Sequence, residues 1–185
     1  MTVRDTMAEL IADLRALTDA GTSDYTVGGV SYWSDQQLQD ALDGRRQAVR
    51  FIEMSAQPDY ANGAFSYTDY ILPAENMEGG TVLQVLDNTG GTVGGWTFDR
   101  NRGVVTFATD QAGASRFVTG RSYNVNLAAA DVWRKKAAHY ATAYDVSTDN
   151  HSLKRSQLVA QAREQMRYYE AMGWPSSVTM ERGDC

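Results

Sequence analysis

The chain has 185 residues, of which 43% are hydrophobic and 22% charged, and its formal net charge is −6. This composition is typical of a folded globular protein and excludes a largely disordered one. The negative charge argues against unaided tight binding to nucleic acid, which requires clustered Lys and Arg side chains. No apolar run approaches the length of a membrane span, and the first residues lack the pattern of a secretory signal, so no membrane partner is expected. The single cysteine, Cys185, excludes an internal disulfide framework.

Acidic and basic residues are unevenly distributed along the chain. Residues 1–130 contain sixteen acidic and nine basic residues, whereas residues 131–172 contain five acidic and seven basic residues. The first region is therefore negative and the second positive. Oppositely charged regions of one chain can attract each other across an interface between copies.

The first third of the chain is predicted to form two amphipathic helices. The first has apolar residues at the spacing of one helix face, namely Met7, Leu10, Ile11, Leu14 and Leu17. Thr6 with Glu9 makes a capping box at its start. A second capping box, Ser34 with Gln37, opens a helix predicted to continue to about residue 54. Between the helices, short β-prone runs around the glycines at 28–29 predict a hairpin.

Residues 60–126 have the pattern of a small all-β module. Five short β-prone runs are separated by turns, and they read FSYTDYIL, TVLQVLD, VGGWTFD, GVVTFATD and RFVTGRSYNVN. Segments 88–91 and 99–103 have the length and composition of hairpin turns. The paired glycines lack the spacing of a phosphate-binding loop, so they are interpreted as turns. Strands of this number can close a small sandwich or barrel.

The helical period returns after residue 127 and predicts two more helices. Their apolar stripes consist of Trp133, Ala137, Tyr140 and Tyr144 and of Leu158, Ala162, Met166 and Tyr169. The second helix is predicted to end at Gly173, with Pro175 beyond it. The polar segment 145–152 connects the two.

Helices on both sides of a β region predict an α+β fold, because each amphipathic helix must bury its apolar stripe against another element. The expected architecture is an antiparallel-type helical bundle core of about four helices with an inserted small all-β module of about five strands. The predicted helical core comprises residues 1–56 and 127–173, and the β module comprises residues 57–126. Residues 174–185 form a C-terminal extension.

No motif nominates a catalytic, metal or cofactor site. His139 lies one residue off the apolar stripe and His151 lies in the connector, and neither belongs to a zinc-binding pattern. Asp145 and Asp149 are four residues apart but lack the remaining ligands of a calcium loop. A nucleophilic serine would require an elbow such as GxSxG, which is absent. We therefore expect no enzymatic activity and no cofactor.

Three stretches, YWSDQQLQDALDGRR, RSYNVNLAAADVWRKKAAHYA and YDVSTDNHSLKRSQLVAQA, resemble the head-to-tail adaptor proteins of tailed bacteriophages. These small proteins are also called head-completion, connector or neck proteins. In that family a Trp-Ser/Thr-Asp helix start, an Ala-rich helix, and a Tyr-Asp-x-Ser-x-Asp connector leading to an Arg-Ser-Gln helix recur in this order. The resemblance covers residues 31–52 and 121–172 most specifically.

The resemblance implies a structural virion protein. Such adaptors form a ring of roughly twelve subunits beneath the portal protein, which is a closed assembly with a heterologous interface. They extend the DNA conduit and present a surface to the next neck component, a stopper or a tail terminator. DNA would then pass through without sequence-specific binding, aided by like-charge repulsion from an acidic lining. The protein would assemble in the host cytoplasm and reside at the head–tail interface of the virion.

The same resemblance nominates interface residues. Basic side chains that could meet the acidic region of a neighbouring subunit are Arg134, Lys135, Lys136, Lys154 and Arg155. The family implies that the segment after the last helix reaches toward the portal, and its candidate contacts are Trp174, Pro175 and Met180. In the connector, Asp145, Ser147 and Asp149 are expected to hydrogen-bond local backbone and to order the turn.

Two other functions stay open at this point. Aromatic residues of the β module could form a sugar-stacking platform or a protein contact surface, and they are Tyr60, Tyr67, Tyr70, Trp96 and Tyr123. Strand alternation predicts that half or more of them lie in the core. The alternative function is therefore a carbohydrate- or receptor-binding virion module. A small hydrolase with an unrecognised set of catalytic residues is a third reading.

Overall fold

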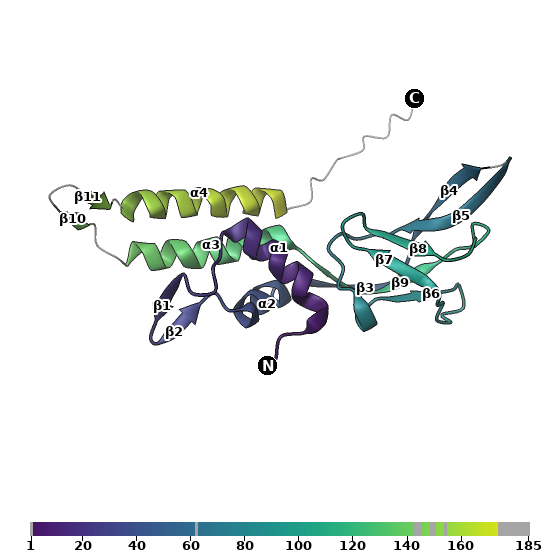
Figure 1. Cartoon of the computed structure of the whole chain (residues 1–185), viewed down its shortest axis with the longest axis horizontal. Coiled ribbons are helices and arrows are strands. Elements are labelled where there is room, and N and C mark those ends of the chain that lie inside the picture. Colours follow the sequence, from purple (N-terminus) through teal and green to yellow (C-terminus); the bar gives the residue numbers. More distant parts are fainter. Residues whose placement is uncertain (1, 62, 143–145, 149–150, 154, 174–185) are drawn as a thin grey trace, which may run out of the picture. The chain divides into compact units, whose positions relative to one another are not determined.

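The computed structural model describes residues 2–61, 63–142, 146–148, 151–153 and 155–173. The chain divides into two compact units, Met1–Val125 and Asn126–Cys185. The fold is mixed α+β, as predicted, with four α-helices and a small antiparallel β module among the described residues (Figure 1). The predicted grouping of residues 1–56 with 127–173 stays a prediction.

The first unit begins with a short 3₁₀ helix, η1 (Asp5–Met7), followed by α1 (Ala8–Thr18). The predicted apolar face is largely confirmed, because Leu10, Ile11 and Leu14 are buried and α1 contacts α2. The predicted capping box of Thr6 with Glu9 is wrong. The N-cap of α1 is Met7, which makes no side-chain cap, and the Thr6 hydroxyl donates instead to a carboxylate far away in the sequence.

The predicted hairpin is confirmed as β1 (Tyr25–Val27) and β2 (Val30–Tyr32). Gly28 and Gly29 at its turn have φ angles of 57° and 82°. A two-residue turn with two positive φ angles matches the twist of the flanking strands, and glycine adopts those angles without steric cost.

The second predicted helix is confirmed only in its first half, as α2 (Asp35–Asp43). Its capping box is present: the Gln37 amide donates to Ser34 Oγ at 3.3 Å, and the Ser34 amide donates to Gln37 Oε1 at 2.8 Å. The predicted continuation to residue 54 is wrong, because α2 ends at Gly44 and strand β3 (Arg46–Glu53) follows. The β-branched and aromatic residues of this segment pair with a strand instead of extending the helix.

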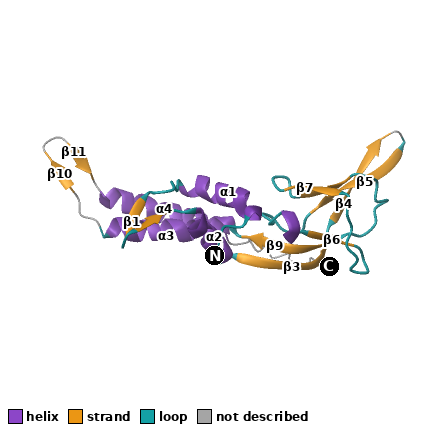
Figure 2. Ribbon diagram, turned by 60° about the horizontal axis from the view of Figure 1, so that its bottom comes forward, coloured by secondary structure: helices purple, strands orange, loops and turns teal. Residues whose placement is uncertain are grey.

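Two antiparallel sheets form the β module of the first unit. One has the order β3-β9-β6, with β6 at Gln84–Leu86 and β9 at Phe117–Tyr123. The other has the order β4-β5-β8-β7, and its bounds are β4 Ser55–Ala61, β5 Ala64–Ile71, β7 Trp96–Asp99 and β8 Val104–Phe107. The five predicted strands are all confirmed, whereas β3 and β4 were not predicted. In Figure 2, β3, β9 and β6 lie below β7 and β4 within this unit.

The core of the β module lies between the two sheets. Both contribute to one cluster of buried side chains, whose members are Val49, Met54, Tyr70, Leu72, Met77, Leu83, Val85, Val105, Phe107 and Val118. The short 3₁₀ turn η2 (Gly80–Val82) leads into β6. The predicted sandwich or barrel of about five strands is therefore a sandwich of two sheets with three and four strands.

The second unit consists of two helices, α3 (Val125–Ala141, of which Val125 ends the first unit) and α4 (Arg155–Gly173), which run side by side in Figure 1. A Cβ placed on Gly173 would lie 2.6 Å from Leu127 side-chain atoms, so the end of α4 touches the start of α3. The two helices are therefore antiparallel. Between them, β10 (Val146–Thr148) and β11 (His151–Leu153) form a small hairpin in the segment predicted as a polar connector.

Candidate functional site

A buried carboxylate, Glu78, is the centre of an extended polar network. Its side chain has 0% exposure. Thr6 Oγ1 donates to its Oε1 at 2.5 Å, and the Tyr123 hydroxyl donates to its Oε2 at 2.6 Å. Arg4 Nε donates to Oε1 at 3.2 Å, and Arg121 Nη1 lies 3.6 Å from Oε2. The network therefore joins residues from the N-terminal segment and from β9 around one negative charge.

Arg4 extends this network to α2. Its two terminal nitrogens donate to both carboxylate oxygens of Asp43, at 2.9 and 2.7 Å, which is the strong bidentate geometry. The same guanidinium donates to the Tyr123 hydroxyl at 3.0 Å, and the Arg4 amide donates to Gln39 Oε1 at 2.7 Å. The chain segment before α1 is thereby fastened to α2 and to the β module.

The network stabilises the ionised carboxylate. Burial acts to raise the pKa of Glu78, but the hydrogen bonds from Thr6 and Tyr123 and the charges of Arg4 and Arg121 outweigh it, so the pKa is lowered. Burial, together with the hydrogen bond to Glu78, raises the pKa of Tyr123 well above its ordinary value. A fully paired carboxylate of this kind is suited to holding elements together and lacks the raised pKa of a general acid.

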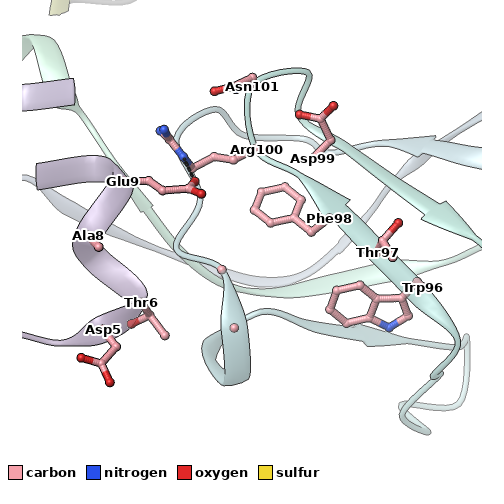
Figure 3. A pocket seen from close by; sticks show the side chains of 12 residues that line it. Asp5, Thr6, Ala8, Glu9, Trp96, Thr97, Phe98, Asp99, Arg100 and Asn101 are labelled. Atoms are coloured by element: carbon pink, nitrogen blue, oxygen red, sulfur yellow. Dashed lines mark hydrogen bonds and ion pairs between the residues drawn. The ribbon is translucent and has the colours of Figure 1, made fainter. Parts of the chain in front are cut away.

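Beside this network lies a groove of about 990 Å³ (Figure 3). One wall is formed by residues 5–9, which include η1 and the start of α1, and the other by residues 96–101, which include β7 and the turn after it. Gly79 and Gly80 lie between the walls. The volume is at the upper end of the range typical of ligand pockets, about 300–1,000 Å³.

Arg100 connects the two walls of the groove. Its Nε donates to Glu9 at 2.9 Å and its Nη1 donates to Asp13 at 2.6 Å, both on α1. Its side chain is only 12% exposed, and the burial, which favours the neutral form, is outweighed by the two carboxylates, so its pKa is raised. The turn between β7 and β8 is thus held on α1.

The basic residues that were nominated for an interface have unequal environments. Arg134 is half-exposed and pairs with Asp131 at 2.7 Å and with Glu170 of α4 at 3.5 Å, and Lys135 is exposed. Lys136 is not a surface cation, because it is 2% exposed and its ammonium lies 5.1 Å from the centroid of the Trp133 ring. Its buried position on α3 is the physical reason that it cannot present its charge to a neighbour.

Several nominated residues lie outside the described residues: Lys154, Trp174, Pro175, Met180, Asp145 and Asp149. Arg155 is the first residue of α4, and Ser147 lies in β10, opposite Ser152 in the hairpin. The structure therefore places Ser147 in a strand pair, and the predicted ordering of the turn by the two aspartates stays a prediction.

The five aromatic residues of the β module that could form a contact surface differ in burial. Tyr70 and Tyr123 are buried, and Tyr67 and Trp96 are half-buried. Tyr60 is 64% exposed and lies 5.0 Å, between ring centroids, from Phe65, which is 61% exposed. This pair occupies the end of the β4–β5 hairpin, and its rings are tilted by 55° to each other.

A second group of exposed apolar side chains lies on α4. Leu158, Tyr168 and Met172 are 37%, 56% and 58% exposed. Tyr168 and Met172 are four residues apart and lie on one helix face, whereas Leu158 lies on the predicted stripe. On the predicted stripe, Ala162 is buried, Met166 and Tyr169 are half-buried, and Leu158, near the start of α4, is the most exposed member. The exposed face formed by Tyr168 and Met172 lies about a quarter turn from that stripe.

Sequence reasoning missed Glu78, Arg4 and the groove, because their partners are brought together only by the fold.

Within the described ranges, no group of three or more His, Cys, Asp or Glu side chains could hold a metal ion. No described helix is both long and apolar enough to cross a membrane. Comparisons with protein family models, with curated proteins and with solved structures give no match.

Proposed function

We propose that this chain is a structural virion protein of a tailed bacteriophage. It forms a ring of about twelve subunits beneath the portal, joins the DNA-filled head to the tail or to the next neck protein, and extends the DNA channel. The three stretches that resemble head-to-tail adaptors include all of α3 and the first half of α4.

The observation that carries the proposal is the exposed apolar face of α4. A helix that already buries one face has no internal use for a second apolar face, and contiguous exposed apolar side chains are typical of protein contact surfaces. Tyr168 and Met172 are residue types that are enriched in such interfaces. An assembly protein needs this kind of surface.

The charge distribution is consistent with the same proposal. All sixteen acidic and nine basic residues of segment 1–130 belong to the first unit, which is therefore strongly negative. A negative lining repels the DNA backbone and lets it slide without adhering. The more positive second unit supplies charges that can attract a neighbouring subunit.

The first test is the copy number of the chain in purified particles of the phage that encodes it, measured by quantitative mass spectrometry against the portal protein. A copy number nearly equal to that of the portal is expected. Absence from particles, with the protein free in the lysate, contradicts the proposal.

The second test uses α4 directly, by co-sedimentation of the purified chain with portal rings. Tyr168→Glu combined with Met172→Glu should weaken the binding at least about tenfold, because charges replace apolar contacts that must be desolvated. The matched control is Ala160→Glu with Ala171→Glu, which adds the same two charges at exposed positions on another face of α4. If both double variants bind portal rings like the wild type, α4 is not the contact surface.

A second candidate function is favoured by one observation, the exposed Tyr60–Phe65 pair. Exposed aromatic rings are the usual stacking surface for sugars. We propose this carbohydrate- or receptor-binding function only as the alternative, because the two rings are tilted rather than coplanar. Saturable glycan binding that is lost in Tyr60→Ala would favour it over the adaptor function.

A further inference from the structure

Each sheet of the β module has two edge strands, and the four edges differ in whether another chain could pair with them. The β4 edge contains Pro58 and a register break between Gln57 and Asp59, which both hinder pairing. The β6 edge is covered, because Leu86 bridges to Thr92 and the Val93 amide donates to Val85. The remaining two edges, β3 and β7, are open in the described part of the chain.

The β7 edge presents the backbone of two residues toward the outside. The Ala108 amide donates to the Gly95 carbonyl at 2.9 Å, which makes these two residues a hydrogen-bonded pair in the register of β7 with β8. Antiparallel pairs alternate, so the N–H and C=O groups of Trp96 and Phe98 point away from β8. These four groups form a short template for one more strand.

The groove described above runs along this open edge. Its wall includes Trp96, Thr97, Phe98 and Asp99 in succession, although successive side chains of a strand point to opposite faces (Figure 3). Consecutive residues share a concavity only along the edge of a strand. The glycines at 79–80 carry no side chains that would fill the space between the walls.

The groove is acidic. Asp5 and Asp99 contribute carboxylates, and the charge of Arg100 is already balanced by Glu9 and Asp13. Asp5 and Asp99 form no ion pair with another described residue. A strand that enters this groove is therefore favoured if it carries positive charge.

The β3 edge has the complementary charge. The Asn124 amide donates to the Arg45 carbonyl at 3.2 Å, so the alternation directs the N–H and C=O groups of Arg46 and Ala48 to the open side. Arg46 and Arg50 are exposed, and neither forms an ion pair with a described residue. The β3 edge is thus an open strand with two uncompensated positive charges.

We propose that β3 of one copy of the chain pairs with β7 of a second copy, along the acidic groove. Pairing of two β3 edges would bring Arg side chains together, and pairing of two grooves would bring carboxylates together. Only the pairing of β3 with the groove brings opposite charges together, so the charges select a heterologous contact. This inference rests on the proposed function, because it names the contact that would join neighbouring subunits of the ring.

The test is sedimentation velocity of the full chain at low ionic strength over a wide concentration range. The wild type should self-associate, and added salt should weaken the association. One variant, Asp5→Lys with Thr97→Lys, makes the groove positive, and another, Arg46→Glu with Arg50→Glu, makes the β3 edge negative. Each alone should raise the apparent dissociation constant at least about tenfold, because like charges then face each other.

Mixing the two variants is the decisive step. The positive groove of the first then meets the negative edge of the second, and the unmodified surfaces also meet, so association should return. Asp59→Lys with Asn88→Lys is the control, because it makes the same charge change at exposed positions outside both surfaces and should associate like the wild type. Circular dichroism verifies that every variant is folded.

A wild type that stays monomeric throughout, or charge variants that associate like the wild type, overturns the inference. So does a mixture that does not recover. Portal binding by the wild type is measured separately, and if it persists in any of these cases the adaptor function stands while this contact falls. Recovery in the mixture without any portal binding supports the contact and removes the adaptor function.

Discussion

Tyr123→Phe tests whether the Glu78 network holds the first unit together. The substitution removes one hydroxyl and leaves the aromatic ring, so packing changes little. The lost hydroxyl donates to Glu78 at 2.6 Å and accepts from Arg4 at 3.0 Å. Glu78 is fully buried and cannot replace the lost donor with bulk water. Arg4 keeps its bidentate contact with Asp43, so the cost arises mainly at the carboxylate.

The expected magnitude follows from the type of bond. A hydrogen bond to a charged group contributes about 1.5–3 kcal/mol to the free energy of unfolding. Tyr123 is only 2% exposed, so little of this is lost to solvent screening. With a urea dependence of about 1–3 kcal/mol per molar, the midpoint of unfolding should fall by roughly 1 M.

The assay is urea denaturation, combined with peptide-resolved hydrogen exchange to assign the transition to the first unit. Tyr67→Phe is the matched control, because the Tyr67 side chain is half-buried and its hydroxyl has no hydrogen-bond partner among the described residues. The control should lie within about 0.5 kcal/mol of the wild type. An equally small effect for Tyr123→Phe would refute the idea that the network stabilises the fold.

Three further predictions concern the same unit. The pKa of Glu78 lies below its ordinary value of 4.5, so its stabilising contribution is complete above about pH 4.5 and is lost as the pH falls through the lower folded-state pKa. Glu78→Gln should therefore flatten the dependence of the unfolding free energy on pH in the acid range. Gly80→Ala should lower the free energy of unfolding by about 1–3 kcal/mol in urea denaturation, because Gly80 has a φ of 65° and a Cβ would lie 2.7 Å from Thr6 Cγ2. Gly79→Ala, the control, should leave the free energy of unfolding nearly unchanged. Ser34→Ala removes a formed N-cap and should lower the thermal midpoint, at a cost of about 1 kcal/mol; an unchanged midpoint contradicts the capping role.

The sequence predicted the elements that are determined by local chemistry. The hairpin at Gly28 and Gly29 needed only two positive φ angles, and the start of α2 needed only a serine three residues before a glutamine. The five later strands were recognisable because each is bounded by turn residues. In these places the local preference and the tertiary structure agree.

The sequence predicted a helix where β3 lies, and this error has a specific cause. Leu42, Val49 and Ile52 are spaced as on a helix face, and that spacing indicated a continuing helix. The strand contains a bulge between Val49 and Ile52, where Phe51 has a φ of 50°. A bulge inserts a residue and breaks the two-residue alternation, so the pattern that identifies a strand was missing. Pairing with β9 decided the structure, and that partner is about 70 residues away in the chain.

The candidate site was hidden for a related reason. Arg4 and Tyr123 are separated by 119 residues, and no spacing rule connects them. The sequence did show Thr6 as a possible cap, but it could not show that a buried carboxylate would compete for the hydroxyl. Thr6 donates to this carboxylate because a buried ionised group needs donors from the protein, whereas the exposed amides of a helix end can donate to water.

The Glu78 network and the groove share residues and are therefore structurally coupled. Thr6 donates to Glu78 and also forms part of the groove wall, next to Asp5. Arg100 fixes the opposite wall to α1 through Glu9 and Asp13. The Thr6 hydrogen bond and the two ion pairs of Arg100 therefore set the distance between the acidic wall and the open edge of β7. A rigid, prearranged groove loses little entropy when a strand enters it, so the interior network and the surface charges serve the same contact.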